Sequence, residues 1–404
     1  MRGGNRPKGG FRLDHRLHHA LRPRLHHESV RSAADASGSW SEKPTSPSRA
    51  GLGTVALVFV ASVLLIGLIA LSAAEGLLSW DVRFAYLPAA ESILDGDSPY
   101  PAVDDPILEE QKGYVYPPQL VLALVPLTLL PVPVVSFLVA LGMLALVGAT
   151  LYVLEIRDVR CYAAAAIWVP TISGMLLGNV SIPLAFALAV VWRYRESVRP
   201  PAIALGLAVS AKLLLWPVFV WVLATRRLRT AALALAVGAA VTVVAWAVIG
   251  FAGLGEYPDL LRRLSELQSE RSYSIVGMAA TLGVGEGVGR AATLVVGGAL
   301  LVACVVLARR GDEERSFTCA VAATLALSPI VWLHYLVLLL VPLAILRPRF
   351  SLLWLLPVLL WVSPRPGYAE GYETFMPGLV AVILVTVLLV RPRRDRGVAA
   401  AATA

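Results

Sequence analysis

The sequence predicts an all-α integral membrane protein whose chain crosses the bilayer about twelve times. Three observations predict this fold class. Hydrophobic residues make up 57% of the 404 positions against 15% charged residues, and the mean hydropathy of +0.72 is unusually high for a soluble chain. Uncharged runs such as 54–74, 134–154 and 231–250 are long enough to cross a hydrocarbon core of about 30 Å. Short arginine clusters recur beside the apolar runs, as the positive-inside rule predicts.

The two ends of the chain differ in composition from the apolar middle. Residues 1–50 are rich in Arg, His, Ser, Pro and Gly, so they cannot bury enough apolar surface to fold alone. We expect 1–50 to be a disordered basic cytoplasmic tail, 51–392 to be the membrane domain and 393–404 to be a second cytoplasmic tail. The first apolar run is too long for a cleaved signal. Solvated polar sequence is a simpler interpretation than metal binding for five tail histidines, which are His15, His18, His19, His26 and His27.

The charged residues predict an orientation. The segment 75–112 holds nine acidic residues and two basic ones, so we expect a long first external loop at 75–117. Both termini are then cytoplasmic. The clusters that we place in the cytoplasm are Arg157/Arg160, Arg193/Arg195/Arg199, Arg226/Arg227/Arg229, Arg309/Arg310/Arg315, Arg347/Arg349 and 391–396.

Three apolar stretches, 161–192, 201–224 and 316–346, lie between two such clusters and must cross the membrane an even number of times. Each therefore predicts a hairpin whose turn faces outward. Arms of about 12–16 residues fall short of the full hydrocarbon core, so the broken backbone must line a polar cavity. The predicted turns are Gly178-Asn179, Ala211-Lys212 and the region 328–335. The alternative for 201–224 is one ordinary span with Lys212 at its middle.

The remaining stretches complete the predicted order. The proline-bounded segment 119–130 is expected to be half-inserted. In a second external loop, 252–275, four leucines share one helical face, which predicts an amphipathic helix at the membrane surface. The expected spans are near 52–74, 134–155, 161–176, 179–192, 201–212, 213–224, 231–250, 291–308, 316–329, 333–346, 351–362 and 374–390.

The first external loop carries the strongest chemical signal, in the segments WDVRFAY at 80–86, GDSPY at 96–100 and YVYPP at 114–118. An aspartate just beyond a span is partly desolvated by the bilayer edge and by aromatic neighbours, which makes it a better proton acceptor. Asp81 is therefore our candidate general base. The alternative is an acid at a helix end that pairs with Arg83 or is simply solvated.

The outward turns add two cations. Lys212 is the only lysine in an apolar run, and His334 is the only histidine outside the tail. Cations in a cavity of this kind suit a lipid phosphate. The alternatives are a lysine that extends toward the interface and a hydrogen-bonded interior imidazole.

Metal and nucleic-acid chemistry are not expected. The cysteines, Cys161, Cys304 and Cys319, have no CxxC spacing, so neither a zinc site nor a disulfide framework is supported. Asp95-Gly96-Asp97 mimics the DxD of metal-dependent transferases but lies in a turn-like stretch where acids commonly cap and solvate. The net charge of +8 comes from separate clusters and not from one basic and aromatic face, so nucleic acid is not an expected partner.

The order and spacing of these motifs resemble a known family over roughly 76–345. It is glycosyltransferase family 87, the polytopic polyprenol-phosphate-mannose-dependent mannosyltransferases of mycobacteria and other actinobacteria, which have the GT-C fold. The first fifty residues and the second external loop depart from the family pattern, which leaves the acceptor open. The motifs that carry the resemblance are Asp81 with Tyr86, 96–100, Tyr116-Pro117-Pro118, Gly178-Asn179, Ala211-Lys212 with Pro217, and Ser328-Pro329 followed by Trp332, His334 and Tyr335.

The resemblance implies an inverting transfer. Asp81 would be the general base and His334 would assist, while an acceptor hydroxyl attacks a β-linked mannosyl phosphate and releases polyprenyl phosphate. Phosphate is a good leaving group, so neither an acid nor a cofactor is required, and Lys212 is our inferred partner for its charge. The candidate substrate-binding residues are Lys212, Arg83, Tyr86, Tyr116, Asn179, Trp332 and Tyr335.

The resemblance also implies partners and a location. The expected partners are a polyprenyl-phosphate-sugar donor, a glycolipid or glycan acceptor of the cell envelope, and membrane lipids. The expected location is the plasma membrane, with the active site on the extracytoplasmic face. The alternatives are a lipid-linked-sugar flippase or transporter, although no internal repeat is evident, a membrane scaffold, and a transferase for another polyprenyl-phosphate sugar such as arabinose.

Overall fold

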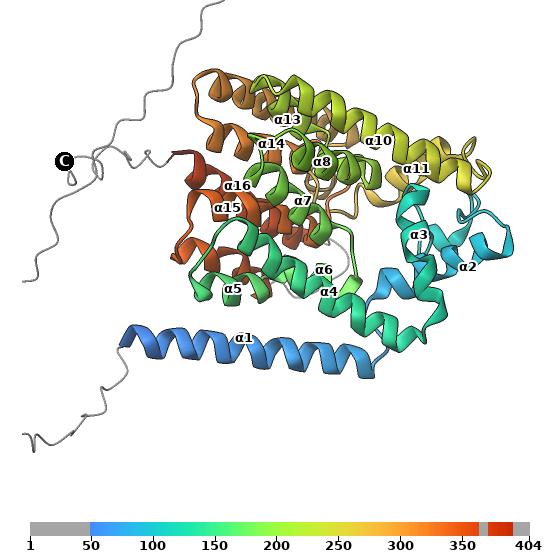
Figure 1. Cartoon of the computed structure of the whole chain (residues 1–404), viewed down its shortest axis with the longest axis horizontal. Helices are drawn as coiled ribbons and strands as arrows, with labels where there is room; N and C mark the ends of the chain where they lie inside the picture. Colours follow the sequence, from blue (N-terminus) through green and yellow to red (C-terminus); the bar gives the residue numbers. More distant parts are fainter. Residues whose placement is uncertain (1–48, 363–370, 391–404) are drawn as a thin grey trace, which may run out of the picture. The chain divides into compact units, whose positions relative to one another are not determined.

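A computed structural model describes residues 49–362 and 371–390 (Figure 1). Residues 1–48 and 391–404 lie outside the described part, so the predictions of two disordered tails stay predictions. Within the described residues the secondary structure consists of helices joined by turns, and it contains no β-strand. The all-α fold class is confirmed for that part of the chain.

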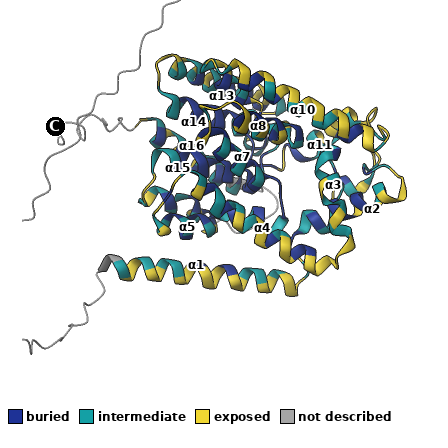
Figure 2. Cartoon of the chain, in the orientation of Figure 1, coloured by how far each residue is buried: buried dark blue, intermediate teal, exposed yellow. Residues whose placement is uncertain are grey.

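Four described helices are long and apolar enough to cross a membrane. In the most apolar part of α1 only 11% of the residues are buried, and exposed residues follow the whole helix in Figure 2. Uncharged apolar surface of this length is stable in lipid and not in water. The four helices are α1 (Arg49–Ala74), α4 (Val132–Val153), α10 (Leu228–Val248) and α13 (Glu286–Arg309).

The prediction of about twelve full spans is not confirmed, because the described part holds four helices of that length, or five if a bent pair counts as one span. The pair is α5 (Val159–Ala166) and α6 (Val169–Leu177), which meet at 60°. Most other apolar helices have 10–17 residues, and at about 1.5 Å per residue these fall short of the hydrocarbon core. Three of them coincide with predicted hairpin arms, namely Ser181–Arg193, Leu213–Ala224 and Leu333–Leu346.

The helices of the three predicted hairpins break near the predicted turns. In the first, α6 is followed by α7 (Ser181–Arg193). In the second, α8 (Arg199–Ala211) is followed by the short 3₁₀ helix η4 (Leu213–Leu215) and by α9 (Pro217–Ala224). The third consists of α14 (Glu313–Ala326), η5 (Leu333–Leu339) and α15 (Leu340–Leu346).

The two segments that the sequence predicts to be external loops, called the external loops below, also contain helices. The predicted amphipathic helix is confirmed as α11 (Tyr257–Gln268), which buries Leu260. The proline-bounded segment forms α3 (Pro118–Leu124) and η3 (Val125–Leu129). The remaining elements are η1 (Val82–Tyr86), α2 (Leu87–Asp95), η2 (Pro106–Leu108), α12 (Ile275–Thr281), η6 (Leu352–Val362), η7 (Gly371–Thr374) and α16 (Phe375–Val390).

The best-packed part of the core surrounds η5 and α15, where every residue from 333 to 344 is buried. Aromatic rings fill the neighbouring space: Trp192, Trp221 and Phe317 have ring centroids 4.9–5.9 Å apart. A tryptophan on the other side of the core, Trp168, donates from Nε1 to the carbonyl of Trp354 over 2.7 Å. Because these rings fix the core, η5 is a rigid support for the side chains at its start.

Two glycines bring α8 and α10 into close contact. A methyl group added at Gly206 would lie 2.6 Å from the carbonyl oxygen of Ala234, and Gly238 faces Gly206 from α10. Small residues allow such close approach between membrane helices. The crossing fixes the end of α8, which leads directly to Lys212.

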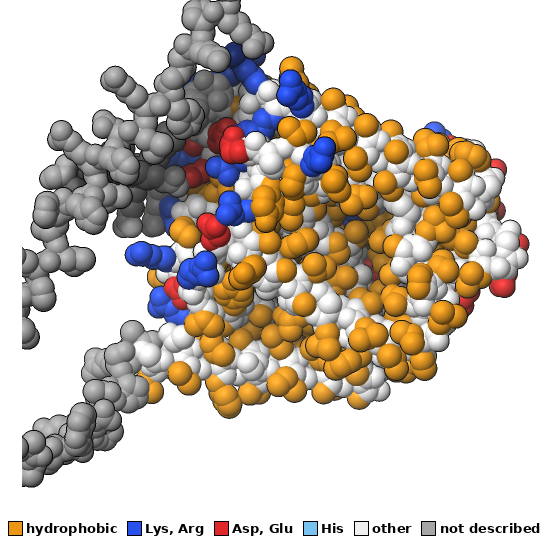
Figure 3. All heavy atoms as spheres, in the orientation of Figure 1, with side chains coloured by type: hydrophobic (Ala, Val, Ile, Leu, Met, Phe, Trp, Pro, Cys, Tyr) orange, Lys and Arg blue, Asp and Glu red, His pale blue; other side chains and the backbone are white. Residues whose placement is uncertain are grey.

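Charged side chains gather at the two ends of the visible face. Figure 3 shows most of its Lys and Arg side chains at one end, with some Asp and Glu side chains among them. Other Asp and Glu side chains lie at the far tip of the opposite end, and a broad hydrophobic surface lies between the two ends. Figure 1 places α2, α3 and α11 at the acidic end. A wide apolar belt between two polar ends is the surface expected of a membrane protein.

Candidate functional site

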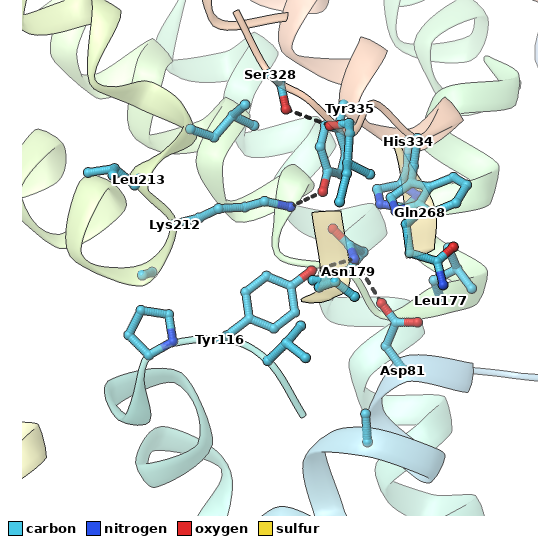
Figure 4. Close-up of a pocket in the computed structure, with 18 of the residues that line it drawn as sticks. Asp81, Tyr116, Leu177, Asn179, Lys212, Leu213, Gln268, Ser328, His334 and Tyr335 are labelled. Atoms are coloured by element: carbon cyan, nitrogen blue, oxygen red, sulfur yellow. Dashed lines mark hydrogen bonds between the residues drawn. The ribbon is translucent and has the colours of Figure 1, made fainter. Parts of the chain in front are cut away.

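A cavity of about 1520 Å³ lies between the membrane helices and the two external loops. Most of its wall is apolar; α6, α8 and α10 contribute part of it, and much of the rest comes from the segments 77–117, 257–268 and 324–335. Figure 4 shows the polar side chains that share this pocket. Those discussed below are Asp81, Tyr116, Asn179, Lys212, Gln268, His334 and Tyr335.

Asp81 lies just before a helical turn in the segment that follows α1. Ser79 adopts a left-handed backbone conformation with φ of 57°, and its hydroxyl donates to the carbonyl of Ser136 in α4 over 2.8 Å. The chain then enters η1, a π-helical turn directly after Asp81. Such turns are frequent at functional sites because they redirect side chains. The half-buried Asp81 side chain lines the cavity.

The side chain of Arg83, in the same turn, points away from the cavity that Asp81 lines. Its guanidinium donates to the carbonyl of Gly76 and lies 5.5 Å from the ring centroid of Phe84. The side chain does not line the described cavity. A substrate-binding role for Arg83 stays a prediction, and its observed contact is with the chain just after α1.

Asn179 reaches Asp81 because a glycine precedes it. Gly178 ends α6 with φ of +69°, and a Cβ there would lie 2.7 Å from Cγ2 of Val82. Only glycine allows the end of α6 to approach η1 so closely. Nδ2 of Asn179 donates to Oδ2 of Asp81 over 2.8 Å and lies 3.4 Å from the hydroxyl of Tyr116.

The orientation of the Asn179 amide is fixed from its other side. Its Oδ1 accepts hydrogen bonds from the backbone N–H of Ser181 over 3.1 Å and from the Ser181 hydroxyl over 2.8 Å. Because the oxygen is occupied by two donors, the amino group must face Asp81. The carboxylate is therefore held by a donor that is itself held in place.

The surroundings of Asp81 make it a stronger proton acceptor than a solvated aspartate. Burial raises the pKa of the Asp81 carboxyl to about 6, although the hydrogen bond from Asn179 and the positive charge of Lys212 act to lower this pKa. A carboxyl group with such a pKa is mostly ionised at neutral pH and yet binds a proton more readily than usual. This is the protonation behaviour of a general base.

Tyrosines cover the cavity side of the first external loop. Tyr86 packs edge-on against Tyr114 and Tyr116, with centroids 5.8 and 5.7 Å away. Burial raises the pKa of Tyr116 to about 12, so its hydroxyl remains protonated and is available as a hydrogen-bond donor. Tyr86 and Tyr116 both line the cavity.

The second external loop and α10 hold this tyrosine segment in place. Tyr100 stacks on Trp246 of α10 with centroids 5.5 Å apart, and its hydroxyl donates to the carbonyl of Tyr116 over 3.1 Å. The hydroxyl of Tyr257, in α11, donates to the carbonyl of Val115 over 3.1 Å. Two bonds to neighbouring carbonyls fix the position of the Tyr116 ring.

Lys212 lies at the break between α8 and η4. Its extended backbone, with φ of −154° and ψ of 117°, ends the helix. The break leaves the Ser210 carbonyl near the helix end, where Gln119 of α3 donates to it from Nε2. The side chain of Lys212 is thereby directed into the cavity.

Two tyrosines hold the Lys212 ammonium group. Nζ donates to the hydroxyl of Tyr335, and it lies 3.8 Å from the ring centroid of Tyr335 and 5.2 Å from that of Tyr116. Aromatic faces attract a cation without neutralising it. Among the described residues no carboxylate forms an ion pair with Lys212, so its charge remains available to an anion.

His334 begins the rigid η5 segment and is 4% exposed. Its ring packs edge-on against Tyr335, with centroids 5.0 Å apart. Within the described part of the chain its Nε2 has no hydrogen-bond partner. Buried polar atoms are normally paired, so an unpaired one on a cavity wall indicates a partner that arrives with a ligand. Trp332 lines the same cavity and is half-buried.

The structure brings every predicted site residue except Arg83 to the wall of this one cavity. Sequence reasoning missed Gln268, Gln111 and Ser265, which line it from the two external loops. A signal for two of them was present. Ser265 and Gln268 follow Leu261 by four and seven positions, so they share a helical face with it.

The described residues show no metal site, because no three His, Cys, Asp or Glu side chains lie close enough together to hold an ion. Asp95 and Asp97 flank Gly96 at the end of α2, where both are exposed and lie away from the cavity wall. The three cysteines are buried and unpaired.

Comparison with protein-family models matches residues 114–329, more than half of the chain, to the family described as glycosyltransferase family 87. The chain belongs to glycosyltransferase family 87. Searches of curated proteins and of solved structures gave no match. The matched segment of this glycosyltransferase contains Tyr116, Asn179 and Lys212, whereas Asp81 precedes it and His334 follows it. The geometry of the cavity thus adds polar groups from outside the matched segment, Asp81 and His334 among them.

Proposed function

We propose that this membrane glycosyltransferase moves a mannosyl unit from polyprenyl-phosphate-mannose to a glycolipid or glycan of the cell envelope. The transfer inverts the configuration at the anomeric carbon and takes place on the extracytoplasmic face of the plasma membrane. One observation carries the proposal: a single cavity, walled largely by apolar side chains, holds a hydrogen-bonded carboxylate at Asp81 and, at Lys212, an ammonium group that no described carboxylate pairs with.

The cavity wall supports a lipid-linked donor. The part contributed by η4, α9 and α10 is apolar and leads from Lys212, at its polar end, along membrane helices. A polyprenyl chain needs such a wall, while its phosphate needs a cation at the end. Side chains of this wall include Leu213, Phe219, Leu235 and Val243.

Asp81 and Lys212 divide the chemistry between them. In our scheme Asp81 accepts the proton of the acceptor hydroxyl while the oxygen of that hydroxyl bonds to the anomeric carbon. The bond from that carbon to the phosphate oxygen breaks with its electrons moving to the phosphate, and Lys212 stabilises the additional charge. Tyr116 and Tyr335 keep the ammonium in place without cancelling it. Nε2 of His334 binds a substrate oxygen.

A labelled donor separates this proposal from its alternatives. The protein is reconstituted in liposomes with radiolabelled polyprenyl-phosphate-mannose, unlabelled membrane lipid extract and, in a parallel sample, labelled polyprenyl-phosphate-arabinose. A mannosyltransferase consumes the mannosyl donor and forms a new labelled glycolipid. Relocation of intact donor across the bilayer without a new product would instead identify a flippase. If product forms from the arabinosyl donor alone, the transferred sugar is arabinose and not mannose, and the protein is still a glycosyltransferase.

The pH dependence of transfer tests the link between Asn179 and Asp81. Wild-type activity should fall as the pH drops through about 6, because the base must be unprotonated and the pKa of Asp81 is raised to about 6 by burial. The hydrogen bond from Asn179 favours the carboxylate. Its removal in Asn179→Ala should therefore raise the pKa of Asp81 and move the acid limb upward by about one unit.

The measurement is kcat/KM for labelled transfer between about pH 5 and 9, a range that covers the titration of a raised aspartate. The ratio of variant to wild-type activity should be lowest at acid pH, reach about one half near pH 7 and level off at higher pH. A control, Ser173→Ala, alters another polar side chain of the cavity wall without touching Asp81. A variant profile that is uniformly lower at every pH, with an unmoved limb, would contradict the role given to Asn179.

A further inference from the structure

The wall of the cavity opposite Lys212 carries a group of uncharged polar side chains. Gln268, at the end of α11, is 1% exposed and lines the cavity. Its Nε2 donates to the carbonyl of Leu108 over 3.2 Å, and its Oε1 accepts from Nε2 of Gln111 over 3.0 Å. Ser265, one turn earlier in α11, also lines the cavity. The two external loops thus meet through a pair of amides.

These side chains keep hydrogen-bonding capacity that faces the cavity. Each glutamine amino group has two hydrogens, and the contacts above use one of each. The Oε1 of Gln111 and the hydroxyl of Ser265 add acceptors and a further donor. The set therefore offers donors and acceptors in similar number and is itself uncharged, and the carboxylate beside it in the cavity lining, Glu110, is paired with Lys112 over 2.8 Å. This is the chemistry that suits sugar hydroxyls, each of which both donates and accepts.

Other features of this wall fit a sugar better than a phosphate or a lipid chain. The half-buried ring of Trp80 lines the cavity and offers a flat apolar face of the kind that a pyranose ring covers. The backbone of Gln111 is held in the left-handed region with φ of 58°. This conformation is unfavourable in free energy for a residue other than glycine, so contacts with the surroundings must hold it. Such positions concentrate at ligand sites.

The direction of the reaction decides which sugar binds there. Inversion by one displacement requires the acceptor oxygen to approach the anomeric carbon from the side opposite the departing phosphate. In our proposed function the phosphate lies at Lys212. Figure 4 shows Lys212 on one side of the pocket and Gln268 on the other, with Asp81 on the side of Gln268. The acceptor must therefore enter on the side of the glutamine pair.

We propose that Gln268, Gln111 and Ser265 form a subsite that binds the hydroxyl groups of a carbohydrate unit of the acceptor, next to the hydroxyl that is attacked. The acceptor is then a glycoside and not a bare lipid alcohol or a polypeptide. This inference rests on the proposed function, because it uses the donor phosphate at Lys212 to assign the opposite wall.

Kinetics with chemically defined acceptors test the subsite. The probes are octyl α-mannopyranoside and n-octanol, with labelled polyprenyl-phosphate-mannose as donor, and total lipid extract of the producing cells is a second acceptor source. The variants are Gln268→Met, which keeps the length of the side chain, Gln111→Asn, which suits the left-handed backbone, and Ser265→Ala. Glu266→Gln is the matched control, because it lies on the exposed side of α11 outside the cavity wall.

The variants are expected to change the KM for the acceptor but not the KM for the donor. Wild type should prefer octyl mannoside to octanol, and Gln268→Met should raise the acceptor KM at least about tenfold, as expected for the loss of one or more hydrogen bonds to ligand. Gln111→Asn and Ser265→Ala should raise it less. The donor KM and the slow hydrolysis of donor by water should stay as in wild type, which a general loosening of the fold would not allow.

Two kinds of failure are distinguishable. If wild type transfers to octanol as well as to octyl mannoside, or if the variants change donor KM and acceptor KM equally, the subsite is wrong and the proposed function stands. If wild type makes no product from the mannosyl donor with either the probes or the extract, both the proposed function and the subsite are wrong.

Discussion

Asp81→Asn is expected to lower sugar transfer by about 10²–10⁴-fold, the usual contribution of a general base. The asparagine oxygen still accepts the hydrogen bond that Asn179 donates to Oδ2, so the local structure should persist. The proton acceptor is lost because an amide does not ionise. The measurement is the initial rate of product formation from labelled polyprenyl-phosphate-mannose, with the amount of folded protein determined by gel filtration in detergent.

A second acid in the same loop provides the control. Asp97→Asn changes an exposed carboxylate outside the cavity wall and should leave the rate within a factor of about two, as surface substitutions usually do. Turnover at the wild-type rate in Asp81→Asn would remove Asp81 as the base. Loss of folded protein in that variant would be resolved with Asp81→Glu, which keeps a carboxylate and should retain measurable activity.

Lys212→Met should lower kcat by about 10²–10³-fold, the scale found when one preorganised electrostatic group is removed from a site of charge development. Methionine is unbranched like lysine and only one atom shorter, but it carries no charge. The reason for the expected loss is that the positive charge acts on the phosphate as the bond to the sugar breaks. Single-turnover measurement of donor cleavage checks this, because it reports the chemical step separately from product release.

Arg262→Met is the comparison substitution, since the exposed Arg262 pairs with Asp259 over 2.9 Å and does not line the cavity. Its kcat should be close to that of wild type. Lys212→Arg keeps the charge but changes the geometry between the two tyrosines, so an intermediate rate is expected. An unchanged rate of donor cleavage in Lys212→Met, with folded protein at wild-type amounts, would rule out the role assigned to this lysine.

Sequence patterns predicted the helices but not the number of complete crossings. Gly178, Lys212 and Pro329 mark breaks because glycine, charge and proline each interrupt an apolar helix, and the structure has breaks at or beside all three. The count of twelve included hairpin arms that were expected to fall short of the full hydrocarbon core. The observed helices have such lengths, since α7 has 13 residues and α9 has 8, whereas α4 has 22, and a count of full-length helices therefore does not reach twelve.

Long-range contacts explain what the sequence could not predict about the site. Gln111 and Gln268 are bonded to each other although 157 positions separate them, and α11 considered alone has the pattern of a helix on a membrane surface. Arg83 illustrates the reverse case. Its position beside Asp81 predicted a role in substrate binding, but its guanidinium bonds to the carbonyl of Gly76, seven positions earlier.

The fixed orientation of the Asn179 amide determines which carboxylate oxygen of Asp81 is open to a proton. Since its amino group bonds to Oδ2 of Asp81, the other carboxylate oxygen, Oδ1, is the one that Asn179 leaves open to a proton. A nucleophile is then activated best along the approach that Oδ1 faces, because the Asn179 amide lies on the side of Oδ2. Regioselectivity, the choice of one hydroxyl among several on a sugar ring, would then follow from the direction of a single lone pair.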